Sequence, residues 1–344
     1  MRYAQPEHSI EIVNRSGKTL VNYQASSHED IEISLSVIDN WRAAHAYPAQ
    51  SFYVTLKRRA CKVHKQSLVA QRIKRLPSIV SKLERESSMK LSQMQDIGGC
   101  RAVVQTVSQV RQLESEIENI RWKHIRLKPK DYITHPKESG YRGIHLKYKY
   151  VGTGKKSPYS GLKIELQLRT ALQHRWATAV EAADTFTKQS LKSSRGSKDW
   201  QRFFALMSSI FALKEKSALV PGTPSSREDL VAEIKDLNSN HHIATLFSTY
   251  AAIFPRVENT KDAAYFLVNL DPIAKTAWIR GFKKEESQKA NAAYTAAEKN
   301  LAPDSPTQIV LVSVSSVAAL KRVYPNYFLD TTAFLADVNV LINS

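Results

Sequence analysis

Residues 131–170 read DYITHPKESGYRGIHLKYKYVGTGKKSPYSGLKIELQLRT and carry the strongest fold signal of the chain. Two runs with alternating apolar residues, 143–151 and 162–168, predict neighbouring strands joined by a turn rich in Gly, Lys and Ser. Because side chains alternate along a strand, one face of the second run is polar throughout. That face carries Lys163, Glu165, Gln167 and Arg169.

The first run follows the same alternation. One set consists of Tyr141, Gly143, His145 and Lys147, and the other of Arg142, Ile144 and Leu146. A carboxylate, an amide and a guanidinium on one strand face, beside a tyrosine and a histidine, suit an anionic, aromatic ligand such as a nucleotide. The ordinary alternative is a half-exposed strand whose outer face is merely solvated.

The composition of the chain bounds its class. A length of 344 residues, 42% of them hydrophobic, suggests two domains, or one large domain with an extension. No apolar run is long enough to span a membrane, and the N-terminus lacks the apolar core of a signal peptide. The two cysteines, Cys61 and Cys100, exclude a disulfide framework. We therefore expect a cytoplasmic protein without a membrane partner.

The net charge of +18 is concentrated in the first two hundred residues, and the remainder of the chain is close to neutral. A localised basic excess predicts polyanionic partners, which are nucleotide phosphates, RNA or both. A lysine-rich surface that only confers solubility is the alternative.

The order of predicted elements divides the chain. We expect helices at 27–46, 49–64, 77–86, 110–120, 171–187 and 200–219, and strands at 68–74 and 98–106. Beyond a Pro/Gly/Ser-rich stretch, helices at 227–237, 243–254, 285–301 and 332–342 alternate with a hairpin at 263–270 and 276–282 and a strand at 309–314. A further helix and a turn near 324–328 follow that strand. This order predicts a domain at 1–219, a linker at 220–226 and a small C-terminal α+β domain at 227–344 without an assigned role.

A basic helix start precedes the opening segment. Arg72 and Lys74 come just before the helix, in which Ser78, Lys82 and Arg85 recur at i, i+4 and i+7 and so share one face. A helix N-terminus flanked by cations suits a phosphate. An ordinary basic amphipathic helix explains the same pattern.

Asp96 lies just before a predicted strand, and two glycines after it would let the backbone approach a ligand. Taken alone, this pattern is usually only a turn. An enzyme that uses a magnesium nucleotide needs one or two carboxylates for the metal and several cations for the other phosphate oxygens. Asp96 and Glu165 are the two isolated acids among cations in strand contexts, and only folding could bring them together.

Four strings in order resemble the RelA/SpoT nucleotidyltransferase domain of alarmone synthetases: RIKRLPSIVSKLER, DIGGCRAVV, DYITHPKESGYRGIHL and IELQLRTALQHRWA. Each is weak alone, but order and spacing both fit, over about residues 45–190. The resemblance implies an α/β (α+β) fold, a mixed β-sheet flanked by helices as in polymerase-β-like nucleotidyltransferases. It also implies transfer of the β,γ-pyrophosphate of ATP to the 3′-hydroxyl of GDP or GTP, giving guanosine tetra- or pentaphosphate and AMP.

The same resemblance implies roles for individual residues. Asp96 and Glu165 would hold Mg²⁺, and Glu165 would take the proton of the attacking hydroxyl. The implied ATP site consists of Arg72, Lys74, Ser78, Lys82, Arg85 and Arg101, of which the first and last would flank the adenine. The implied acceptor site consists of Lys137, Tyr141, Arg142, His145, Gln167 and Arg169, with the tyrosine stacked on the base.

Two departures from the family pattern lie on the acceptor side. Gly143 stands where alarmone synthetases usually carry serine, and residues 179–184 replace a frequent Glu-His pair. Two alternatives therefore stay open: a toxin-type enzyme that pyrophosphorylates the 3′ end of tRNA, and a catalytically silent regulator that binds nucleotide or RNA. A second copy of the chain and a cognate antitoxin or hydrolase are further candidate partners. Since no His-Asp dipeptide occurs, we expect a synthetase without the hydrolase half of long family members.

Overall fold

The computed structural model describes residues 3–187, 198–241, 263–271, 276–301, 308–313 and 332–343. Its described strands form one eight-stranded sheet in the order β3-β4-β5-β2-β1-β8-β6-β7. Within it, β2 and β5 run parallel, and each other neighbouring pair is antiparallel. The predicted mixed sheet flanked by helices is thus confirmed.

The first half of the chain builds five of these strands and the helices around them. The strands are β1 (Leu68–Ile73), β2 (Gly98–Val104), β3 (Ile125–Asp131), β4 (Ile144–Lys149) and β5 (Lys163–Thr170). The helices are α1 (Ile10–Val21), α2 (His28–Ala44), α3 (Ala46–Val63), α4 (Leu76–Arg85), α5 (Val107–Glu118) and α6 (Ala171–Thr187).

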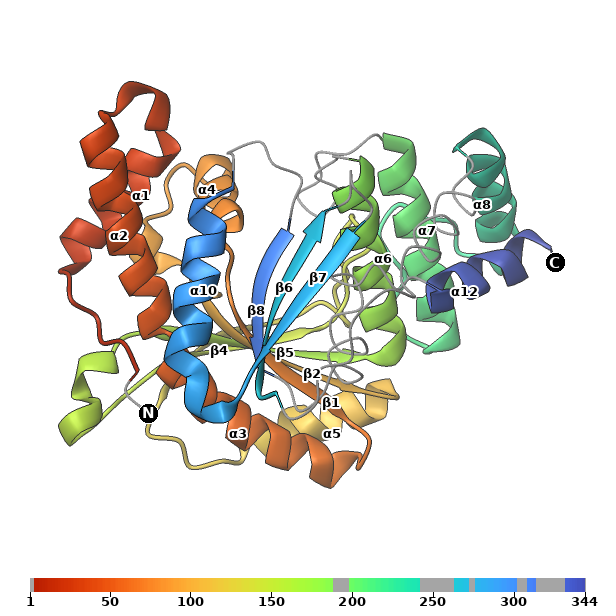
Figure 1. The fold of residues 1–344 in the computed structure, drawn as a ribbon. Helices are drawn as coiled ribbons and strands as arrows, with labels where there is room; N and C mark the ends of the chain where they lie inside the picture. The colour runs from red at the N-terminus through yellow and green to blue at the C-terminus, as the bar shows by residue number, and fades with distance from the viewer. Residues whose placement is uncertain are drawn as a thin grey trace.

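Helices α3 and α5 cover one face of this sheet, the lower side in Figure 1. That face presents apolar side chains of β2 and β5, among them Ala102, Leu166 and Leu168, which are fully buried. Cys100 belongs to the same row, and its Sγ donates to the Ala49 carbonyl of α3 at 3.4 Å. The alternation of each strand therefore turns the polar side chains to the opposite face.

Local signals explain most of these elements. The side chain of Ser27 caps α2, accepting from Asp30 N at 3.1 Å. Helix α1 was not predicted, because Gly17 interrupts its helical pattern. That glycine sits where a Cβ would lie 2.9 Å from Leu91 Cβ, so the helix needs a residue without a side chain there. Strand β3 was missed as well, since its sequence IRLKPKD is charged, holds a proline and lies largely exposed at the sheet edge.

The second half of the chain adds α7 (Lys198–Lys214), α8 (Arg227–His241), β6 (Tyr265–Asp271), β7 (Thr276–Phe282), α10 (Ser287–Lys299), β8 (Gln308–Ser313) and α12 (Thr332–Ile342). The predicted hairpin is confirmed, because β6 and β7 pair in antiparallel register. The helix predicted at 243–254, the helix after 314 and the turn at 324–328 fall outside the described residues. None of the described helices combines the length and apolar character needed to cross a membrane.

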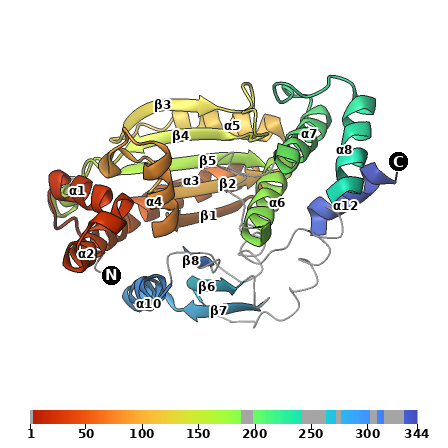
Figure 2. The same cartoon turned by 90° about the horizontal axis from the view of Figure 1, so that it is seen from above.

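The described elements beyond the predicted linker do not stand apart from the rest. Strand β8 pairs with β1 through Gln71 and Arg72, so β8, β6 and β7 extend the same sheet past β1 (Figure 2). Helices α8 and α12 bury Leu230 and Phe334 in one cluster with α6 and α7. The division into 1–219 and 227–344 stays a prediction, but elements from both sides of it share a sheet and a core.

Helix α10 also contacts the start of α4. Glu298 Oε1 accepts from the backbone nitrogen of Leu76, the first residue of α4, at 3.3 Å. Its Oε2 lies 2.7 Å from Arg42 Nη1, and both side chains of this ion pair are at most 5% exposed. Arg42 in turn donates to the Tyr294 hydroxyl. A carboxylate from the second half of the chain therefore occupies the positive end of α4.

Candidate active site

The polar face of the sheet runs across four strands. Arg72 of β1 lies opposite Gly99 of β2, Gly99 opposite Glu165 of β5, and Glu165 opposite Lys147 of β4. Paired residues point to the same side of a sheet, so these positions form one row. The adjacent row consists of Arg101, Gln167 and His145. The alternation predicted for β5 thus continues on both neighbouring strands.

Asp96 lies two residues before β2 and joins two of the predicted phosphate ligands. Lys74 Nζ donates to its Oδ2 at 2.7 Å, and Lys82 Nζ donates to its Oδ1 at 3.1 Å. Burial alone would raise the pKa of Asp96, but the two ammonium groups outweigh it and hold that pKa well below its usual range. The predicted basic helix and the predicted acid therefore meet in one cluster.

Glu165 is buried in the middle of β5, with 6% of its surface exposed. His145 Nδ1 lies 2.9 Å from its Oε1, and Gln167 Nε2 donates to its Oε2 at 2.7 Å. Burial would raise the pKa of Glu165, but the charge of His145 outweighs burial and lowers that pKa to about 2. The charge of Asp96 also acts on Glu165, which puts the two acids in one electrostatic site.

Tyr141, His145 and Arg169 form a triad beside Glu165, in which Arg169 is buried and the other two are half-buried. Arg169 Nη2 donates to the Tyr141 hydroxyl at 2.8 Å, and His145 Nε2 bonds the same oxygen. Burial would raise the pKa of Tyr141, but Arg169 and then His145 lower it to about 8. Burial would lower the pKa of His145, but Tyr141 and Glu165 raise it to about 9. A protonated imidazole therefore donates to the carboxylate on one side and the phenol on the other.

Two cations, from different segments of the chain, lie near the ring of Tyr141. The guanidinium carbon of Arg169 lies 5.0 Å from the ring centroid, and Lys137 Nζ lies 5.5 Å from it. Lys137 is exposed, whereas Arg169 is buried in the strand. A base that stacked on this ring would most easily replace Lys137.

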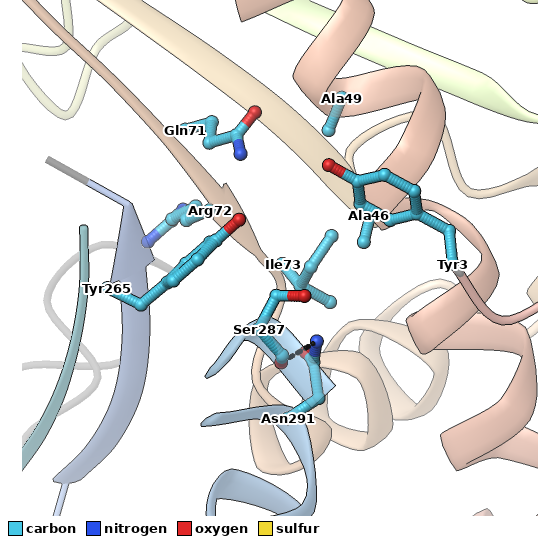
Figure 3. Close-up of a pocket in the computed structure, with 9 residues that line it drawn as sticks. All are labelled: Tyr3, Ala46, Ala49, Gln71, Arg72, Ile73, Tyr265, Ser287 and Asn291. Carbon is cyan, nitrogen blue, oxygen red and sulfur yellow. Dashed lines mark hydrogen bonds between the residues drawn. The ribbon is translucent and has the colours of Figure 1, made fainter. Parts of the chain in front are cut away.

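The remaining residues of the implied ATP site lie on α4 and the first two strands. Ser78 is the third residue of α4, and Arg85 lies near its end with Nη2 3.6 Å from Glu86. Arg101 is buried at 6% exposure on β2. Arg72 lines a pocket between β1 and the second half of the chain, together with Tyr265 of β6 (Figure 3). Tyr265 shares a row with Gln71 and Cys100, so this pocket opens on the α3 side of the sheet and not on the polar face.

Arg142 is the one implied acceptor residue that the structure places away from this face. It is 2% exposed, and its Nη1 donates to Glu215 Oε2 at 2.6 Å and to Ser217 Oγ at 3.0 Å. Its Nε donates to Ser208 of α7 at 3.1 Å. The reason is the strand alternation, which assigns Arg142 to the set opposite His145. Its implied acceptor role stays a prediction, and in this structure Arg142 anchors the segment before β4 to α7.

One residue of the polar face had received no role. Lys147 belongs to the same alternation set as His145 and lies directly across from Glu165. It is 8% exposed. The alternation alone was the signal that could have identified it.

Carboxylates are the donors that Mg²⁺ takes in proteins beside nucleotide phosphates. Each carboxylate oxygen of Asp96 and Glu165 accepts a hydrogen bond from a side chain and keeps a second lone pair. Within the described ranges, no three His, Cys, Asp or Glu side chains cluster as a metal site. The donor set therefore fits Mg²⁺ only together with oxygens that a nucleotide supplies.

Residues 71–190 match the model of the region found in RelA/SpoT proteins. Over 115 residues the chain is 35% identical to GTP pyrophosphokinase YjbM of Bacillus subtilis, covering 32% of this chain and 52% of that relative. It is 23% identical over 271 residues to a probable chloroplastic GTP diphosphokinase, CRSH, of Arabidopsis thaliana, covering 70% of this chain and 42% of the relative. Residues 71–190 are therefore a RelA/SpoT region.

The chain spans about half the length, or less, of the curated relatives it matches. Among solved structures, it is similar to small alarmone synthetase 1 from Bacillus subtilis bound to its product pppGpp. The TM-score is 0.43 at 23% identity, covering 49% of this chain and 88% of that one.

His145 should titrate far above an ordinary histidine in the metal-free protein. Its ring proton signals are expected to change near pH 9, whereas the buried His45, whose pKa burial lowers to about 4, stays neutral there and serves as the control. The pKa of His145 in the folded protein exceeds its unfolded value of about 6.5. Protonation of His145 therefore stabilises the fold, fully so below about pH 6.5. This contribution is lost as the pH rises through about 9. Proton NMR of wild type and Glu165→Gln tests this, since the variant should titrate lower. A wild-type midpoint near 6.5 would contradict it.

Gly143, the departure from the family pattern, has a backbone reason. Its φ is +147°, and a Cβ there would lie 3.2 Å from Arg169 Cγ and 3.3 Å from the Leu168 carbonyl oxygen. We expect Gly143→Ser to lower the free energy of unfolding by about 1–3 kcal/mol. Urea denaturation measures this loss. Gly99→Ala is the matched control, because a Cβ there meets nothing closer than 3.7 Å. Equal stability of Gly143→Ser and wild type would show that the backbone relaxes.

Proposed function

We propose that this chain is a pyrophosphokinase that transfers the β,γ-pyrophosphate of ATP to the 3′-hydroxyl of GDP or GTP. The observation that carries the proposal is that two carboxylates, Asp96 just before β2 and Glu165 on the polar face, lie close enough for the charge of one to act on the other. Asp96 is held by Lys74 and Lys82, and Glu165 by His145 and Gln167. One cluster is rich in phosphate-binding cations, and the other lies beside an aromatic triad that suits a base and its phosphates.

The proposed reaction forms one bond to phosphorus and breaks one, and it requires the negative charge of the phosphates to be neutralised. The 3′-oxygen of the acceptor attacks the β-phosphorus of ATP, the bond from that phosphorus to the α,β-bridging oxygen breaks, and AMP leaves. The proton of the attacking hydroxyl passes to Glu165, which is ionised at neutral pH since its pKa is about 2. Such transfers depend mainly on positioning and on offsetting phosphate charge.

The cations around Asp96 have a second role in this proposal. Lys74 and Lys82 pair with Asp96 in the described structure, and a polyphosphate offers both ammonium groups stronger acceptors. Asp96 and Glu165 would hold Mg²⁺, which would offset the negative charge that develops on the phosphate oxygens. On the acceptor side, Arg169 and Lys137 would bind phosphate or flank the base, while His145 keeps Glu165 oriented.

The test uses γ-labelled ATP with Mg²⁺ and, separately, GDP, GTP, ADP, ATP or bulk tRNA. We expect labelled guanosine tetra- or pentaphosphate, with AMP released in equal amount only when a guanine nucleotide is present. Label on tRNA would favour the toxin-type alternative. No AMP with any acceptor would refute transfer and favour the silent regulator. A second copy, an antitoxin or a hydrolase as partner, and a cytoplasmic location, stay predictions of the sequence.

A further inference from the structure

A buried lysine that the proposed reaction has not used lies in the middle of the site. Lys147 pairs in register with Glu165, and the residue is 8% exposed. Lys74 and Lys82 both pair with Asp96. Among the described residues, by contrast, no oxygen accepts a hydrogen bond or forms an ion pair with the Lys147 ammonium.

The charges around Lys147 come from both halves of the site. Glu165 and Asp96 act on its ammonium with attraction, and Lys130 and Lys82 with repulsion. Lys82 belongs to α4, on the side of the implied ATP phosphates. Lys130 of β3 lies across from His145, on the acceptor side. Lys147 therefore lies where the two halves meet.

The nearest carboxylate does not satisfy this ammonium. Both oxygens of Glu165 already accept hydrogen bonds, one with His145 and one from Gln167. Burial removes part of the hydration of the Lys147 ammonium without supplying an acceptor, which is costly, and two neighbouring lysines add repulsion. A ligand that brings several negative charges to this point removes the cost, and a polyphosphate between Asp96 and Glu165 is such a ligand.

We propose that Lys147 is a phosphate-binding residue at the junction of donor and acceptor, where it contacts the oxygens of the transferred pyrophosphate. The assignment rests on the proposed function, since it takes the donor to be a nucleoside triphosphate. Its position differs from that of Lys74 and Lys82, which reach the site from β1 and α4. Lys147 reaches it from β4, beside the proposed base.

The experiment measures binding of α,β-methylene-ATP, which cannot react, by calorimetry with and without Mg²⁺. We expect Lys147→Met to weaken this binding roughly 10- to 100-fold while leaving the affinity for AMP unchanged. Lys147→Arg should restore part of the loss. Lys149→Met is the matched control, because it removes one exposed lysine from the same strand and the same alternation set.

Unchanged affinity of Lys147→Met for the analogue would overturn the assignment, and so would a wild-type protein that binds no analogue. Unfolding in urea separates a folding defect from a binding defect, since methionine preserves the volume of the side chain. An equal loss of AMP binding would also overturn it, because it would point to a general distortion. If the Lys147 variants change analogue affinity as expected but wild type transfers no pyrophosphate, the phosphate-binding role of Lys147 is supported and the proposed reaction is refuted.

Discussion

Glu165→Gln is expected to slow pyrophosphate transfer by roughly 10²- to 10⁴-fold. Glutamine keeps the shape of the side chain but loses the charge, so it neither accepts the hydroxyl proton nor binds Mg²⁺ as a carboxylate does. Affinity for α,β-methylene-ATP should change little, since the cations proposed to bind the phosphates lie on β1, just after it, on α4 and on β4. The measurement is AMP release in a single turnover with saturating GDP or GTP.

The control for this substitution is Glu114→Gln. Glu114 pairs with Arg111 on the outside of α5, away from the polar face, so its amide should leave transfer unchanged. If the Glu165→Gln protein were as active as wild type, Glu165 would have no role in catalysis. Activity lost together with analogue binding would instead assign Glu165 to binding.

Asp96→Asn is expected to separate binding from transfer. The carboxylate holds Lys74 and Lys82, whose side chains are 12% and 21% exposed, and its loss frees both ammonium groups for phosphate. Without Mg²⁺, the variant should bind α,β-methylene-ATP roughly tenfold more tightly than wild type, because no internal anion competes. Transfer with Mg²⁺ should fall by at least roughly 10²-fold, since one of the two carboxylates proposed to hold the metal is gone.

Calorimetry in the presence of a chelator measures the first effect, and single-turnover AMP release measures the second. Asp131→Asn is the control: Asp131 ends β3 opposite Ile144 and pairs with Arg111 of α5, on the other face of the sheet. Weaker metal-free binding by Asp96→Asn would contradict the expected competition. It would mean that Asp96 orders the two lysines for phosphate.

The site could be predicted from the sequence in two ways, from the alternation of side chains along the strands and from the family resemblance. Alternation along β4 and β5 is a local property with period two, so it correctly predicted which side chains share the polar face. It also put Arg142 on the opposite face and Lys147 on the site face. The family resemblance nevertheless gave Arg142 an acceptor role and Lys147 none. The strand register of Lys147 and the contact of Arg142 with α7 agree with this alternation, while the roles of both residues stay predictions.

Other features depended on contacts that local pattern does not encode. The link from Lys74 and Lys82 to Asp96 joins segments that meet only in the folded chain, and only the resemblance indicated it. Strand β3 carries charges and a proline because it is an edge, so it lacks the apolar alternation of inner strands. The composition break at 220–226 was visible, but the pairing of β8 with β1 was not, since strand pairing over such separations leaves no local signature.

The hydrogen bond from Leu76 to Glu298 makes the start of α4 a shared position. A phosphate that bound the first amide groups of α4 would compete with this carboxylate for the same donors. Nucleotide binding and the contact of α10 with the start of α4 would then depend on each other. If the docked α10 weakens nucleotide binding by some factor, bound nucleotide must weaken the docking of α10 by the same factor. The second half of the chain would then act as a tethered competitor, whose local concentration is fixed by covalent connection rather than by expression level.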